Sequence, residues 1–361
     1  MDPFSIKRVP YIVLCNIIRQ IPDWVTLENL IEASPRIREI FEPGKNPNEA
    51  AEPAATHIVD IILKGNSIMK GQLHRHFWRI TELKQLTPEE MKEEFGGARP
   101  VLRRIGLNEG REPEQRSLTE FLARHKPPSF ISRVALWETV HMAANIQRLA
   151  CACLTFLRGL LQAHWDWNKR FHPMKPLDLS PFSWEEEYRV YRALWHLQLY
   201  SVLHKGGILP VNGPIVCVRG QYQPWVGTWD LLPGVARVEI QTVSQCLSNL
   251  VRRNHNLNLN GWREWAGWKK WYPLITEMPD ASRLEFGFSV WSPPPQPQCL
   301  RGVIEPFLER LKDWAAQKKL DFKKSGLELS HSWHIPGNRM IGLLTWDVCR
   351  LFYSGLWPLH Y

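Results

Sequence analysis

The chain has 361 residues, and its hydrophobic content of 44% and charged content of 22% are those of ordinary globular proteins. This composition excludes a chain that is disordered throughout its length. Lysine and arginine number 45 against 36 aspartates and glutamates, a net charge of +9, which allows contact with acidic partners or nucleic acid without requiring it. The 18 tryptophans are the unusual number, and they predict a core built from large aromatic side chains.

The cysteines indicate a reducing compartment. There are seven, an odd count with irregular spacing, and no Cys-x-x-Cys pair or Asn-x-Ser/Thr acceptor site occurs. Cys151 and Cys153 lie inside a predicted helix and are expected to be small buried residues rather than a disulfide. The first ten residues do not resemble a secretory signal, and no membrane-spanning stretch is predicted. We therefore expect an intracellular protein of the cytoplasm or nucleus.

Residues 4–42 are predicted to form a small unit of two or three short helices. Val13, Ile17 and Ile21 recur at helical spacing. Pro10 lies near the expected first turn, where proline is tolerated, and Pro22 ends this first helix.

Two more helices are expected in the same unit. The second begins after residue 22, with Asp23 or Thr26 as its cap, and carries Leu27 and Leu30 on its apolar face. The third opens at residues 34–35, where a serine cap precedes a proline. The unit is too small to hold a stable core alone.

A linker at 43–56 and a large domain at 57–361 are predicted to follow. Capping boxes at 87–90 and 183–186 start two helices. The apolar residues of 129–163 cover more than one face, which indicates a long, central, buried helix. Glycines at 206–207 end the helix that starts at 183, and a proline-rich break lies at 292–297. With no repeat and few alternating patterns, the fold class is mainly α, and the class of the large domain stays open.

The N-terminal pattern resembles an F-box, in particular the divergent F-box that opens many filamentous-fungal proteins. The residues that carry the resemblance are Val9-Pro10, the apolar positions up to Ile21-Pro22, Leu27, Leu30, Ala33-Ser34-Pro35 and Phe41. Residues 183–195 and 344–347 look like parts of the same fungal family.

The resemblance implies a substrate receptor of a cullin–RING ubiquitin ligase. F-box helices bind a Skp-family adaptor, and the domain behind them holds a protein substrate. By this likeness the adaptor-binding residues would be Pro10, Val13, Ile17, Ile21, Leu27 and Leu30. An alternative reading is that these helices simply pack on the rest of the chain.

A tryptophan-rich tract supports a second hypothesis, a helical scaffold that binds another protein or nucleic acid. Trp262, Trp265 and Trp268 recur every three residues beside Arg263 and Lys269. Aromatic and cationic side chains in alternation can grip a peptide or stack on the bases of single strands. Burial in the core explains the same tryptophans, and the sequence favours it over peptide contact and disfavours nucleic acid.

No catalytic signature is present, so we expect no enzyme activity, no metal and no cofactor. The serine-hydrolase elbow, the phosphate-binding loop and the His-Glu-x-x-His motif are absent. His74 and His76 are two positions apart and would share a face only on a strand, and they are interpreted as surface or helix-end histidines. His331 and His334 have no third ligand at a suitable spacing.

Overall fold

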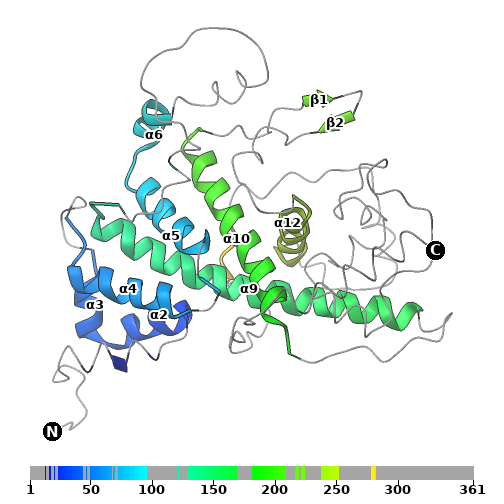
Figure 1. The fold of residues 1–361 in the computed structure, drawn as a ribbon, viewed down its shortest axis with the longest axis horizontal. Coiled ribbons are helices and arrows are strands. Elements are labelled where there is room, and N and C mark those ends of the chain that lie inside the picture. The colour runs from blue at the N-terminus through cyan, green and yellow to red at the C-terminus, as the bar shows by residue number, and fades with distance from the viewer. Residues whose placement is uncertain are drawn as a thin grey trace, which may run out of the picture.

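The computed structural model describes residues 13, 16–17, 20, 23–43, 46, 49–66, 68–69, 72–95, 121, 128–168, 181–208, 216–218, 221–223, 237–251 and 278–281. Within these residues the protein is mainly helical, as predicted from the sequence (Figure 1). The helices are α2 (Trp24–Ala33), α3 (Pro35–Phe41), α4 (Pro53–Gly65), α5 (Gln72–Leu83), α6 (Pro88–Phe95), α9 (Arg133–Asn168), α10 (Trp184–Lys205) and α12 (Arg237–Val251). One antiparallel hairpin joins β1 (Val216–Val218) to β2 (Gln221–Gln223), with Cys217 opposite Tyr222.

The long helix α9 is the centre of the fold. Its 36 residues span about 54 Å, and α2, α3, α5, α10 and α12 all pack on it. Residues Arg133–Gln162 are long and apolar enough to cross a membrane, but 72% of that window is buried inside the fold. The helix is therefore covered by the rest of the fold on most of its surface, which confirms the prediction of a buried helix at 129–163.

The predicted helix starts are confirmed by their hydrogen bonds. The Asp23 side chain accepts from the Thr26 backbone nitrogen at 2.8 Å and caps α2. Thr87 and Glu90 cap α6 reciprocally, and Ser183 and Glu186 form the capping box of α10. Each cap satisfies backbone N–H groups that the first helical turn leaves without partners.

An aromatic cluster fills the junction of α2, α5 and α10. Trp24 stacks on Phe77 with ring centroids 4.9 Å apart and planes 8° from parallel. Phe77 also meets Trp78 edge-on at 5.1 Å and Trp195 at 6.1 Å. All four side chains are buried, so Trp24, Trp78 and Trp195 build an aromatic core of the kind that the tryptophan count predicted. Cys151 and Cys153 are buried free thiols, also as expected.

The N-terminal helices are not a separate unit. Buried residues of α2 and α3 belong to the same hydrophobic cluster as those of α9 and α10. The predicted linker at 43–56 is wrong in part, because α4 already begins at Pro53. Residues 49–51 also pair with the segment before α9: the Ala51 nitrogen donates to the Ile131 carbonyl and the Arg133 nitrogen to the Glu49 carbonyl, both at 2.8 Å. The proline-rich break at 292–297 lies outside the described residues.

Candidate functional site

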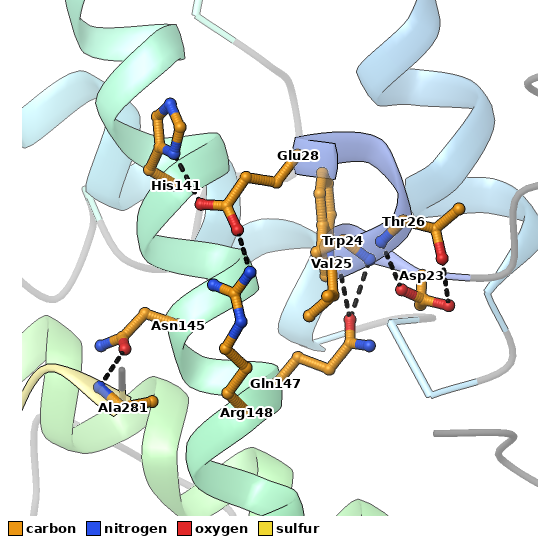
Figure 2. A network of polar contacts seen from close by, with 10 residues as sticks. All are labelled: Asp23, Trp24, Val25, Thr26, Glu28, His141, Asn145, Gln147, Arg148 and Ala281. Atoms are coloured by element: carbon orange, nitrogen blue, oxygen red, sulfur yellow. Dashed lines mark hydrogen bonds and ion pairs between the residues drawn. The ribbon is translucent and has the colours of Figure 1, made fainter. Parts of the chain in front are cut away.

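A polar network joins α2 to α9, and Figure 2 shows it between the two helices. Glu28 of α2 is buried, and one of its carboxylate oxygens lies 2.6 Å from His141 Nδ1. The other oxygen forms an ion pair with the guanidinium of Arg148. His141 and Arg148 are two turns apart on α9, so together they hold the carboxylate from both sides. A buried carboxylate needs this pairing to remain charged.

The surroundings of Glu28 act on its charge in opposite directions. Burial by itself raises the pKa of the Glu28 carboxyl, but hydrogen bonds from His141 and Arg148 outweigh it and hold the pKa below its ordinary value. The charged form is therefore the stable one in the folded protein, and α2 is tied to α9 by an ion pair at neutral pH.

The start of α2 is held by a second side chain of α9. Gln147 Oε1 accepts a hydrogen bond from the Trp24 backbone nitrogen at 2.8 Å and a longer one from the Val25 nitrogen at 3.4 Å. With Asp23 accepting from Thr26, three of the N–H groups at the start of α2 are satisfied (Figure 2). The first turn of this helix therefore depends on a residue more than 120 positions away.

Asn145 extends the same face of α9 to a distant segment. Its Nδ2 donates to the Pro279 carbonyl at 2.9 Å, and its Oδ1 accepts from the Ala281 nitrogen at 2.8 Å. A side-chain amide that donates to a carbonyl and accepts from an N–H pairs with the backbone as a neighbouring β-strand would. Asn145, Gln147 and Arg148 thus join residues 23–28 and 279–281 to one stretch of α9 (Figure 2).

A histidine pair lies at the α5–α10 interface. His76 and His196 are both buried, with their Nε2 atoms 3.2 Å apart and their rings edge-on at a centroid distance of 4.5 Å. Burial lowers the pKa of His76 well below its ordinary value and lowers that of His196 to about 4. The interpretation of His76 as a surface histidine is wrong, because the face of α5 that carries it packs against α10. His74, by contrast, is half-buried.

The predicted adaptor-binding residues that the structure describes differ in exposure. Val13 and Ile17 have helical backbone, and their side chains are 42% and 48% exposed. Leu30 is half-buried against the core, and Leu27 is fully buried. Leu27 therefore faces this chain's own core and not solvent, which corrects its assignment as a contact residue. Pro10 and Ile21 lie outside the described residues, as do Trp262, Trp265 and Trp268.

His141 is held from two sides within the described residues. The Glu28 carboxylate lies 2.6 Å from its Nδ1, and the Trp137 ring lies edge-on to the imidazole at a centroid distance of 4.4 Å. Across the described ranges, no group of three or more His, Cys, Asp or Glu side chains could hold a metal ion. His331 and His334 fall outside those ranges. The ion pair and hydrogen bonds of this network hold α2 against α9.

Comparison of the chain with protein-family models, curated proteins and solved structures finds no match in any of the three. The interpretation of the site therefore depends on its own geometry. The sequence predicted the helix caps and named Val13 and Ile17 as contact residues. It did not identify Glu28, His141, Gln147 and Arg148. Their polar character on otherwise apolar helix faces was the only local signal, and their pairing depends on the tertiary fold.

Proposed function

We propose that this protein is an F-box-like receptor that joins a protein substrate to a Skp–cullin–RING ubiquitin ligase. Its N-terminal helical residues would bind the Skp-family adaptor, and the helical body would hold the substrate. The chain itself would have no catalytic role, and its place would be inside the cell, in the cytoplasm or nucleus.

The observation that carries the proposal is the exposure of Val13 and Ile17. Four large apolar side chains are exposed among the described residues, and two of them are these neighbours, four positions apart in helical residues. Side chains at i and i+4 lie on the same face of a helix. Burial of two exposed apolar side chains against a partner is favourable, as when an apolar groove binds a helix.

The burial of Leu27 reduces the adaptor contact that the F-box resemblance implies. Val13 and Ile17 are the residues on which the proposed adaptor contact depends, and the half-buried Leu30 is a further candidate. The polar network between α2 and α9 supports this role, because it ties the helix that follows residues 13–17 in the chain to the helical body.

The test is a pull-down of the purified full chain with a Skp-family adaptor. We expect the wild type to bind and the Ile17→Asp variant to lose binding at least tenfold, because a charge would enter an apolar contact. Phe130→Asp is the matched control, since Phe130 is 51% exposed and lies before α9. Circular dichroism checks that both variants keep their helices. No binding by the wild type would refute the proposal.

A second candidate function is a helical scaffold whose N-terminal helices are purely structural. The packing of Trp24, Leu27 and Ile31 inside the chain's own core favours it. Such a scaffold would bind another protein or nucleic acid through its basic, tryptophan-rich part. Binding to single-stranded RNA that weakens steeply with salt would support the nucleic-acid branch, since phosphate contacts release counterions.

A further inference from the structure

The hydrogen bonds of His76 and His196 define one protonation state. His196 Nδ1 lies 2.8 Å from the Arg192 carbonyl, which can only accept, so this nitrogen carries the proton. In a neutral ring Nε2 of His196 is then an acceptor. The Nε2 of His76, 3.2 Å away, must be the donor. The contact between the two helices therefore requires a neutral His196.

A proton added to His196 would convert this contact from attraction to repulsion. Its Nε2 would become a donor facing the Nε2–H of His76, and a charge would stand in a site where His196 is 1% exposed. We propose that the His76–His196 pair is an acid-sensitive contact that holds α5 to α10 and opens in mild acid.

The neighbouring charges make the pair more sensitive to acid. Arg75 of α5 and Arg192 of α10 are the charged side chains that act on the two imidazoles, and both disfavour a further positive charge. From α12, Glu239 pairs with Arg192 at 2.6 Å and does not shift the pKa of either imidazole. From α9, no charged side chain among the described residues shifts the pKa of either ring.

Proton linkage sets the pH range. The pKa of both histidines is lowered in the closed form, so the contact is stabilised above the ordinary value of 6.5 and is weakened as the pH falls below it. The pH at which this weakening begins is set by the open form, in which the histidines titrate near the ordinary value of 6.5. Two protons taken up on opening reduce the closed-to-open ratio by up to about 100-fold per pH unit. At pH 5 the opening is therefore much more favourable, although each buried ring still resists protonation.

Hydrogen–deuterium exchange of the full chain tests this proposal. Protection of peptides covering α5 and α10 is measured at pH 7.5, 6.5 and 5.5 and corrected for the intrinsic exchange rate at each pH. We expect protection of α5 and the facing part of α10 to fall by at least tenfold between pH 6.5 and 5.5, while α4 keeps its protection.

Three variants separate the histidine pair from other acid effects. The His76→Gln/His196→Gln double variant has no titrating ring and should show no such fall, and His196→Gln alone should show a smaller one. His57→Gln on the exposed face of α4 should behave as the wild type. Unchanged protection of α5 in the wild type would overturn the proposal, and so would an equal loss in α4. The wild-type measurement decides even where a variant does not fold.

Discussion

The side-chain oxygen of Gln147 lies 2.8 Å from the backbone nitrogen of Trp24 and closes the first turn of α2 from outside that helix. Gln147 is 2% exposed, so water cannot replace it. A cap is usually supplied by the residue just before the helix. In α2, Asp23 accepts from one N–H of the first turn and Gln147 of α9 accepts from two others. The folding of α2 is therefore coupled to the presence of α9.

Replacement of Gln147 by leucine should lower the free energy of unfolding by about 1–3 kcal/mol, because buried N–H groups of α2 would lose their acceptor. Chemical denaturation followed by circular dichroism measures the change. The control is Gln162→Leu, since Gln162 is exposed on the same helix. An equal effect of the two substitutions would contradict the role given to Gln147.

Glu28→Gln should destabilise the protein by about 1–3 kcal/mol at pH 7, because Arg148 and His141 would lose their charged partner. The folded pKa of Glu28 lies below its ordinary value of 4.5. The ion pair therefore stabilises the protein above that value, and its contribution is lost as the pH falls through the lower folded pKa. The difference between variant and wild type should shrink in acid. Glu32→Gln, exposed on the same helix, is the control.

Leu27→Ala and Ile17→Ala should separate core residues from surface residues. Leu27 is fully buried, and its truncation leaves a cavity that costs about 2–5 kcal/mol. Ile17 is 48% exposed, and its truncation should change stability by less than about 0.5 kcal/mol. Thermal or urea unfolding gives both values. A large loss for Ile17→Ala would mean that its side chain is covered within the chain.

Gly207→Ala should destabilise the end of α10 by about 1–2 kcal/mol, since its φ of 71° is unfavourable for any residue with a Cβ. The new Cβ would also lie 2.5 Å from the Lys92 Cε, although that flexible side chain can move. Gly65→Ala is the opposite case, because nothing lies within 4 Å of its Cβ position at the end of α4. It should be neutral or stabilising by up to about 1 kcal/mol. Melting temperatures of the two variants compare them directly.

Several features were predictable because their causes are local. The serine at 183 and the glutamate at 186 lie one helical turn apart, so the capping box of α10 can be recognised from spacing alone. The apolar residues on more than one face of α9 indicate burial without any knowledge of the partner. The same reasoning explains why the mainly α class was correct.

The domain boundaries and the contact face of α2 were not predictable in this way. An apolar helix face shows that a helix is covered but does not show by what. Leu27 fits equally well against an adaptor or in the chain's own core, and the structure buries it in that core. The residues at 49–51 look like a linker, yet their backbone groups pair with residues 131–133.

The sequence by itself determined most helices of the described residues, the capping residues that precede them and the aromatic character of the core, since these depend on propensity, spacing and composition. Only the tertiary structure decided which charges and amides meet. Glu28 joins a histidine and an arginine more than 110 residues away, and His76 meets His196 across two helices. Such pairs form because buried polar groups must find partners, and the partner that each one finds depends on how the helices pack.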